Sequence, residues 1–213
     1  PRALTRSIIR LAHDWQDIGH RQDYLLRVLN DCQQIVALSD FMKSLMTAYG
    51  VPADRIELLQ HGPELEGVTV NRAEPARPVS VAFIGSLSTH KGVHLLIEAL
   101  KRRPDLDVRL KLYGAIRKGD AYVDRLLADS RNDPRIHWMG TFPVESLGQV
   151  LSGTDLLALP ALWYENAPLV VKSALHFGIP CLVSDLGTLS EMVREGQDGW
   201  RIRFFQDLRY HSR

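Results

Sequence analysis

The chain has 213 residues, of which 45% are hydrophobic and 24% are charged. These proportions are typical of a globular protein and argue against a disordered, collagen-like or coiled-coil chain. Lys and Arg total 26 and Asp and Glu total 25, so the net charge is only +1. A nucleic-acid-binding protein usually carries a basic surface, and this balance disfavours that class.

Cysteine content and hydropathy indicate the compartment. Cys32 and Cys181 lie far apart, each in an apolar stretch. The sequence leaves a disulfide open but favours two buried thiols in a reducing environment. No stretch approaches the roughly 18 apolar residues that a membrane span needs, and no apolar signal region opens the chain. We therefore expect a soluble, cytoplasmic protein.

The first part of the chain is predicted to be mainly helical. Its first twenty residues are expected to form an amphipathic helix, because apolar residues recur at helical spacing: Leu4, Ile8, Leu11, Trp15 and Ile18. A second helix is predicted over about Arg21–Asp31 and a short buried strand over Gln34–Ser39. Ser39 is then expected to cap a helix over Asp40–Tyr49. Gly and Pro punctuate the stretch from Gln60 to Pro78, which predicts a linker.

Short apolar strands alternate with longer helices after the linker. The predicted strands are Val79–Ile84, Val108–Tyr113, Ile136–Met139, Leu156–Leu159, Cys181–Ser184 and Trp200–Ile202. The predicted helices are Gly92–Arg102, Ala121–Ser130, Val144–Leu151, Pro168–Phe177 and Thr188–Arg194. This alternation indicates an α/β fold, a Rossmann-like, doubly wound parallel sheet with both faces covered. Residues 1–60 hold too few strands for a second such domain, so we expect the chain to be part of a longer protein.

Two loops after predicted strands carry the chemistry, because ligands of an open α/β sheet bind beyond the carboxyl ends of its strands. The first loop runs from Gly85 to Gly92 and contains Ser86 and Lys91. Glycine allows close backbone approach, free N–H groups are expected at the helix start, and a lysine stands beside them. This combination suits an anion, most plausibly a phosphate. A surface loop with a solvated lysine stays open as the alternative.

The second loop follows Leu156–Leu159 and ends in the sequence Glu165-Asn166-Ala167-Pro168-Leu169. Pro168 fits the first helical turn, where its missing N–H costs nothing, and the open N–H groups from Ala167 onward form another anion site. A carboxylate beside a phosphate is unfavourable unless it binds something neutral, such as sugar hydroxyls. We therefore expect Glu165 to bind hydroxyls, the alternative being simple charge complementarity at a helix N-terminus.

Other sequence features give weaker indications. His90 and His94 can share a helical face, but no third ligand is evident, so no metal site is predicted. No G-x-S-x-G motif is present and neither cysteine has a nearby histidine, so nucleophilic catalysis lacks support.

The motifs resemble those of family-4 (group 1) retaining glycosyltransferases, which have the GT-B fold. The segments that carry the resemblance to the donor domain are VAFIGSLSTHKGVHLLIEAL (81–100), LKLYG (110–114), RIHWMGTFP (135–143) and residues 154–200. Residues 35–64 resemble the end of the family's acceptor domain and its interdomain linker. The resemblance implies a fragment of acceptor domain over 1–60, a linker over 61–78 and a nucleotide-sugar-binding domain over 79–213.

The family's functional residues carry over to this chain by position. The resemblance implies that Lys91 and Glu165 are the catalytic residues, Lys91 on the donor diphosphate and Glu165 on hydroxyls of the transferred sugar. The other implied donor-binding residues are Gly85, Ser86, Gly114, Thr141, Asn166, Ala167, Pro168, Leu169 and Ser173. No metal or cofactor is implied, because lysine and the helix N-terminus stabilise the departing diphosphate.

The chain departs from the family pattern at two of these positions. A second glutamate, which usually binds the ribose diol, is expected eight residues after Glu165, where this chain has Ser173. Losing a charge-assisted hydrogen bond of roughly 1.5–3 kcal/mol would weaken donor binding about 10- to 150-fold. Ser86 stands where many relatives carry an arginine for the diphosphate, which leaves more of that contact to Lys91.

We thus expect a glycosyltransferase of glycan biosynthesis that transfers a sugar from a nucleotide diphosphate sugar to an acceptor hydroxyl with retention of configuration. The expected partners are the donor and a glycan, lipid or small-molecule acceptor, with no nucleic acid. Contact with a membrane surface through further parts of the acceptor domain stays open. This chain is expected to be chiefly the donor-binding part and to be inactive alone. The alternative is a non-catalytic nucleotide-sugar-binding or assembly module with a degenerate donor site.

Overall fold

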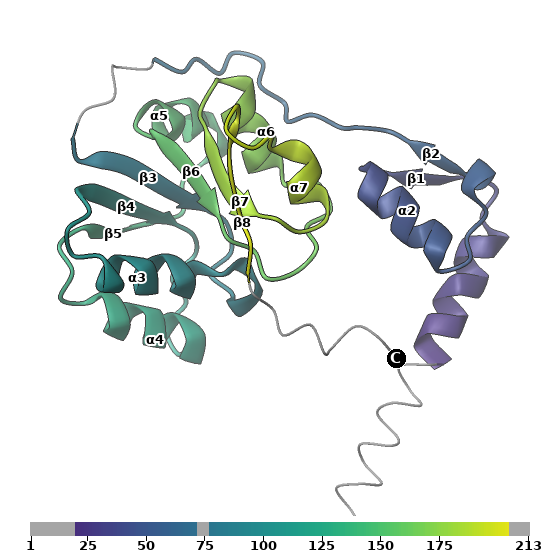
Figure 1. Ribbon diagram of the computed structural model, residues 1–213, viewed down its shortest axis with the longest axis horizontal. Helices are drawn as coiled ribbons and strands as arrows, with labels where there is room; N and C mark the ends of the chain where they lie inside the picture. The colour runs from purple at the N-terminus through teal and green to yellow at the C-terminus, as the bar shows by residue number, and fades with distance from the viewer. Residues whose placement is uncertain (1–19, 72–76, 205–213) are drawn as a thin grey trace, which may run out of the picture. The chain divides into compact units, whose positions relative to one another are not determined.

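The computed structural model describes residues 20–71 and 77–204 (Figure 1). The helix predicted over the first twenty residues falls, up to residue 19, outside the described part of the chain. The chain divides into two compact units, Pro1–His61 and Gly62–Arg213.

The first unit is small and mainly helical, as predicted. A helix covers residues 20–31, followed by β1 (Ile35–Ala37), α2 (Asp40–Ala48), a 3₁₀ turn (Ala53–Arg55) and β2 (Ile56–Leu58). The Ser39 hydroxyl accepts a hydrogen bond from the Met42 N–H, which confirms the predicted helix cap. Strand β2, which pairs parallel to β1, was not predicted, because three residues are too few to show a period.

The second unit is built on a six-stranded parallel sheet in the order β5-β4-β3-β6-β7-β8. Its strands are β3 (Val79–Ile84), β4 (Val108–Tyr113), β5 (Ile136–Gly140), β6 (Leu156–Leu159), β7 (Cys181–Ser184) and β8 (Gly199–Ile202). All six predicted strands are confirmed. Counted from β3 as the first strand, the order is 3-2-1-4-5-6, the arrangement of a Rossmann fold.

Helices cover both faces of this sheet (Figure 1). One face carries α3 (Val93–Arg102) and α4 (Ala121–Ser130), and the other carries α5 (Leu147–Ser152), α6 (Leu169–His176) and α7 (Thr188–Met192). Pro168 is the N-cap of α6 and not part of its first turn, since its ψ of 109° is extended. Helix α7 is shorter than predicted, because the backbone becomes extended at Val193.

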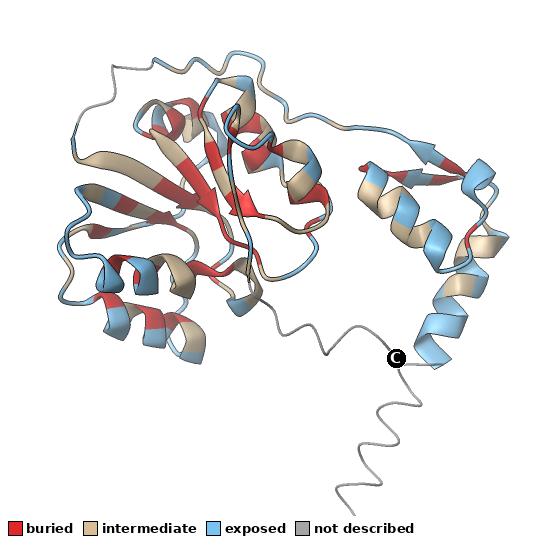
Figure 2. Ribbon diagram, viewed as in Figure 1, coloured by how far each residue is buried: buried red, intermediate tan, exposed pale blue. Residues whose placement is uncertain are grey.

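The core of the second unit lies along the strands and the inner faces of the helices (Figure 2). Phe83, Leu112 and Leu157 are fully buried on three neighbouring strands. Cys181 is buried as predicted, and desolvation raises the pKa of its thiol to about 12, so it stays protonated at neutral pH. Cys32 is only partly buried, which corrects the prediction of two buried thiols, because it lies at the end of a helix in the small first unit.

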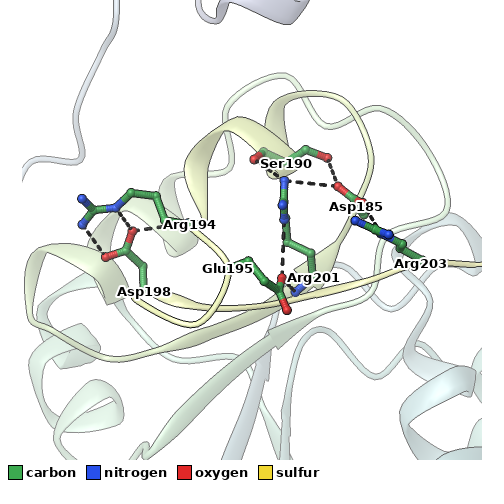
Figure 3. A network of polar contacts seen from close by, with 7 residues as sticks. All are labelled: Asp185, Ser190, Arg194, Glu195, Asp198, Arg201 and Arg203. Atoms are coloured by element: carbon green, nitrogen blue, oxygen red, sulfur yellow. Dashed lines mark hydrogen bonds and ion pairs between the residues drawn. The ribbon is translucent and has the colours of Figure 1, made fainter.

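A network of polar contacts connects β8 to the neighbouring parts of the second unit (Figure 3). Asp185, just after β7, accepts hydrogen bonds from the Ser190 hydroxyl and from Arg203, and its carboxylate lies 3.5 Å from Arg201. The Ser190 hydrogen bond, followed by that of Arg203, holds the pKa of Asp185 below its ordinary value, although desolvation opposes this. Glu195 accepts from the Arg201 N–H at 2.8 Å. The network thereby ties α7 and β8 to the carboxyl end of β7.

Within the described ranges, 20–71 and 77–204, every helix is too short or too polar to cross a lipid bilayer.

Candidate functional site

The candidate site lies at the carboxyl ends of β3 and β6, which are neighbours in the middle of the sheet. From β3 the chain continues to β4 on one side, whereas β6 leads to β7 on the other side. Such a reversal opens a crevice between the two loops, and ligands of doubly wound sheets bind there. The two loops that the sequence singled out separately therefore meet at one place.

The first loop folds more tightly than expected. A 3₁₀ turn (Thr89–Lys91) precedes α3, and Gly92 links them at a φ of 73°. The N–H groups of Lys91 and Gly92 bond back within this turn, at 3.0 and 3.1 Å, and the His94 N–H donates to the Tyr122 hydroxyl. At this helix start the 3₁₀ turn thus uses the Lys91 and Gly92 N–H groups, whereas the Val93 N–H has no acceptor in the described part of the chain.

Free backbone N–H groups lie earlier in the same loop. In the described part of the chain, the N–H groups of Ser86 and Leu87 have no acceptor, whereas the Gly85 N–H donates to the Tyr113 carbonyl at 3.0 Å. A backbone without acceptors directly beyond a strand end is available to an anion. The Ser86 and Leu87 N–H groups are therefore available to an anion bound by this loop.

The two loops are locked together through their backbones. The Leu162 N–H donates to the His90 carbonyl at 2.7 Å. Gly92 approaches the second loop so closely that a Cβ at this position would lie 1.9 Å from the Pro160 carbonyl oxygen. Only glycine combines this approach with a left-handed φ, so the register of the two loops depends on it.

Lys91 and Glu165 form an ion pair across the crevice. The Lys91 Nζ lies 2.6 Å from the Glu165 Oε1, and the side chains are only 17% and 8% exposed. A carboxylate beside an anion site is electrostatically unfavourable by itself. Here the Lys91 ammonium neutralises the Glu165 carboxylate while no anion is bound. Both predicted catalytic residues are therefore in direct contact, although 74 positions separate them in the chain.

Trp163 and His90 make further contacts around this ion pair. The Trp163 indole N–H donates to the same Glu165 Oε1 at 2.6 Å, and the Lys91 Nζ lies 5.8 Å from the indole ring centroid. The ring of His90 stacks against the indole, with centroids 3.9 Å apart. Neither residue was assigned this role from the sequence. The available signal was an aromatic residue that can donate a hydrogen bond, two positions before a loop carboxylate.

The start of α6 presents the second set of free backbone groups. In the described part of the chain, the N–H groups of Leu169 and Val170 have no hydrogen-bond acceptor, as expected in the first turn of a helix. Asn166 is exposed, and Ala167 and Pro168 are half-buried beside them. The helix dipole adds partial positive charge at this end, so an anion is favoured here as well.

Gly85, Gly114 and Thr141 follow β3, β4 and β5, at the same edge of the sheet. Gly114 approaches the first loop closely, because a Cβ there would lie 2.4 Å from the Gly85 carbonyl oxygen. The Gly114 N–H also donates to the Gly140 carbonyl, directly before the exposed Thr141. The structure thus extends the candidate site along three neighbouring strand ends.

Ser173 is placed differently from the other predicted site residues. It is only 2% exposed, and its hydroxyl donates to the Leu169 carbonyl of its own helix at 2.9 Å. Ser173 is therefore a buried residue whose hydroxyl is bonded within α6.

The two histidines considered for a metal site have separate partners. His90 Nε2 lies 3.1 Å from the Ser88 hydroxyl, and His94 Nδ1 lies 2.9 Å from the Tyr122 hydroxyl. Desolvation, with the Arg125 charge, lowers the pKa of His94 against the opposing effect of Glu98. In residues 20–71 and 77–204, no three His, Cys, Asp or Glu side chains are grouped to hold a metal ion.

Residues 70–207 match the sequence profile of the family described as Glycosyl transferases group 1. This match covers more than half of the chain, including both loops and the whole sheet. The chain belongs to this family. The family resemblance of the motifs is thereby confirmed.

Curated relatives of the group 1 chain are themselves glycosyltransferases. It is 29% identical over 207 residues to the D-inositol 3-phosphate glycosyltransferase of Nocardia farcinica, covering 88% of this chain and 44% of the relative. It is 23% identical over 191 residues to the amylovoran biosynthesis glycosyltransferase AmsK of Erwinia amylovora, covering 85% and 46%. The chain thus spans about half the length of the curated relatives that it matches.

Solved structures share the fold of this group 1 chain. Anabaena Alr3699/HepE, crystallised with UDP and glucose, superposes with a TM-score of 0.75 at 21% identity, over 86% of this chain and 53% of that one. Sucrose-phosphate synthase from Thermosynechococcus elongatus gives a TM-score of 0.75 at 18% identity, over 87% and 49%. These superpositions confirm the Rossmann-like fold of a GT-B carboxyl-terminal domain.

Proposed function

We propose that this chain is the donor-binding half of a retaining glycosyltransferase that takes its sugar from a nucleotide diphosphate sugar. The observation that carries the proposal is the Lys91–Glu165 pair at the central crevice, within hydrogen-bond distance at 2.6 Å. Family membership supports it, and so do the free N–H groups on both sides of the crevice. Two free cysteines suit a reducing compartment, which favours the cytoplasm.

In the proposed mechanism the protein acts mainly on the leaving diphosphate. Negative charge develops on that group as the bond between the sugar and the nucleotide breaks. The Lys91 ammonium and the N–H groups of Leu169 and Val170 would stabilise this charge, because preorganised donors need no rearrangement during the reaction. Glu165 would bind hydroxyls of the sugar and hold it in place while the acceptor hydroxyl attacks the anomeric carbon and its proton passes to the departing diphosphate.

Donor binding has to rearrange the ion pair. A diphosphate that contacts Lys91 competes directly with the Glu165 carboxylate for the same ammonium. The cost of separating the pair is then offset by the new phosphate contacts of Lys91 and by the sugar hydroxyls at Glu165. A bare diphosphate supplies only the first compensation, and a neutral sugar only the second. The pair therefore favours ligands that carry both groups.

The test is calorimetric titration of the chain with UDP, GDP and TDP, repeated on Lys91→Ala. One of the nucleotides should bind, and the variant should bind it about 10- to 150-fold more weakly. This range corresponds to the loss of a charge-assisted contact of roughly 1.5–3 kcal/mol. Removing the lysine also leaves the Glu165 carboxylate to repel the diphosphate.

Lys101→Ala is the matched control. Lys101 lies at the other end of α3, where it donates to Asp129 at 3.0 Å and is exposed. Lys91 lies in the 3₁₀ turn just before α3, whereas this variant removes the same charge from the last turn of α3, so it should leave nucleotide affinity unchanged. If the wild-type chain binds none of the three nucleotides at millimolar concentration, or if both variants weaken binding equally, the proposed function is wrong.

The second candidate function is a non-catalytic nucleotide-sugar-binding module. The observation that favours it is Ser173, which takes the place of an expected glutamate and whose buried hydroxyl donates to the Leu169 carbonyl of its own helix. Under this candidate the donor site is degenerate. The two functions differ in whether a carboxylate at residue 173 restores affinity.

A further inference from the structure

Trp163, in the second loop, contacts the first loop and both members of the ion pair, and the proposed mechanism gives it no part. Its indole N–H donates to Glu165, and its ring lies against His90 and near Lys91. The side chain is nevertheless 47% exposed, so it does not serve to fill the core. An exposed aromatic side chain with directed polar contacts at a site indicates a functional role.

The two donors to Glu165 converge on one oxygen. Both the Trp163 Nε1 and the Lys91 Nζ lie 2.6 Å from Oε1, whereas Oε2 accepts no hydrogen bond from the part of the chain that the structure describes. A carboxylate held at Oε1 has a defined plane, and its second oxygen remains available as an acceptor. This is the arrangement needed to present one oxygen to a ligand hydroxyl.

The indole itself is held from the first loop. The His90 ring packs on it at 3.9 Å between centroids, and His90 is in turn bonded to the Ser88 hydroxyl at 3.1 Å. The backbone bond between Leu162 and His90 fixes the separation of the two loops beneath this stack. The ring plane, and therefore the direction of its N–H, is set by contacts outside the second loop.

Lys91 cannot provide this orientation by itself. A lysine ammonium is a point charge on a flexible stem, so it attracts a carboxylate without fixing its plane. In the proposed function Lys91 also turns to the diphosphate when the donor binds. The indole N–H is then the contact that remains on Glu165.

We propose that Trp163 is a positioning residue: its indole N–H orients the Glu165 carboxylate so that Oε2 receives a hydroxyl of the donor's sugar. This inference rests on the proposed function. It adds that the orientation comes from the first loop, through the stacking of His90 on Trp163. Discrimination between the bare nucleotide and its sugar conjugate then depends on a residue that contacts neither the nucleotide nor the reacting bond.

The test uses Trp163→Phe, which keeps an aromatic ring for His90 and removes only the N–H. Dissociation constants are measured by calorimetry for UDP, GDP and TDP and for their glucose conjugates. The variant should leave the constant of the bare nucleotide within twofold. The ratio of the conjugate's constant to that of the nucleotide should rise about fivefold, as expected for one lost hydrogen bond.

Two further variants separate positioning from packing. Trp163→His restores an aromatic N–H donor and should return the ratio toward the wild-type value. Trp200→Phe is the matched control, because Trp200 is 50% exposed on β8, and it should leave the ratio unchanged. Thermal unfolding of all variants shows whether a change in the ratio accompanies a loss of stability.

An independent readout of the contact needs no ligand. The indole N–H resonance of Trp163, assigned in a ¹H–¹⁵N spectrum by its loss in Trp163→Phe, should shift in Glu165→Gln and stay in place in Glu195→Gln. If the Trp163 indole resonance does not shift in Glu165→Gln, the inference is wrong. So does a conjugate-to-nucleotide ratio that is unchanged in Trp163→Phe while the nucleotide binds. Failure of the wild-type chain to bind any nucleotide overturns the proposed function instead, and the inference with it.

Discussion

A single residue, Ser173, decides between the two candidate functions. The resemblance expects a carboxylate here, one turn into α6, whereas this chain has a buried hydroxyl that bonds its own helix. Such a bond satisfies the hydroxyl within the helix, so the hydroxyl needs no hydrogen bond to a ligand. The neighbouring free N–H groups of Leu169 and Val170 are unaffected by it. The anion site at the helix start can therefore persist although the second carboxylate is missing.

Ser173→Glu is expected to tighten nucleotide binding about tenfold if the pocket is a weakened donor site, because a carboxylate that reaches the ribose adds a charge-assisted hydrogen bond. Calorimetry with the nucleotide that the wild-type chain binds measures the change. Ser173→Gln controls for the added bulk without the charge, and circular dichroism checks that both variants remain folded. Equal affinities of the folded glutamate variant and the wild-type chain would favour the non-catalytic module.

At the scale of the elements, the site depends on the close backbone contact between the loop after β3 and the loop after β6. Gly92 is the residue between the 3₁₀ turn and α3, and it combines a left-handed φ of 73° with close approach to the Pro160 carbonyl. Lys91 immediately precedes it. A change in this turn would therefore move the ammonium relative to Glu165 as well as strain the backbone.

Gly92→Ala should lower the free energy of unfolding in two ways. A left-handed alanine costs about 1–2 kcal/mol, and a Cβ 1.9 Å from the Pro160 oxygen adds a further cost of roughly 1–3 kcal/mol for the forced displacement. Urea unfolding followed by circular dichroism measures the sum.

Gly196→Ala is the matched control for that substitution. Gly196 has the same φ of 73°, but a Cβ there has nothing within 4 Å. It should show only the cost of the left-handed conformation. Equal losses of stability in the two variants would mean that the contact between the loops contributes nothing.

The whole molecule consists of two units with separate cores. In the described residues the first unit buries four hydrophobic residues together, whereas the core of the second unit runs through the entire sheet. We propose, as the motifs imply, that residues 1–60 are a fragment of an acceptor domain, 61–78 a linker and 79–213 the donor domain. Part of the proposed linker nonetheless packs on the second unit, where a Cβ at Gly148 would lie 2.5 Å from the Thr69 carbonyl oxygen.

Residues 62–213 alone should unfold cooperatively with the midpoint that the second unit has in the full chain, since its core is self-contained. A fragment of residues 79–213 should be less stable, by about 1–2 kcal/mol. It loses the packing of Val70 on the core and the bond from the Asn71 N–H to the Ser152 hydroxyl. Urea unfolding of the two fragments measures the difference. Equal midpoints of the two fragments would show that residues 62–78 contribute nothing to the stability of the second unit.

The strands and most helices of the second unit could be predicted because their signals are local. Continuous apolar runs such as Val79–Ile84 and glycine-bounded helices are legible within a dozen residues. The predictions fell short at the 3₁₀ turn before α3, the three-residue β2 and the early end of α7. Backbone hydrogen bonds close the 3₁₀ turn, β2 is too short to show a period, and the backbone becomes extended at Val193.

The candidate site was predictable as two separate loops but not as one site. The residues alone predict anion and hydroxyl binding, because the loops contain glycines, a lysine and a carboxylate at a helix start. That Lys91 and Trp163 meet at one oxygen of Glu165 depends on β3 lying beside β6, and the burial of Ser173 depends on how α6 packs. Strand order is set by the burial of the whole sheet between its helices, and no local stretch of sequence encodes it.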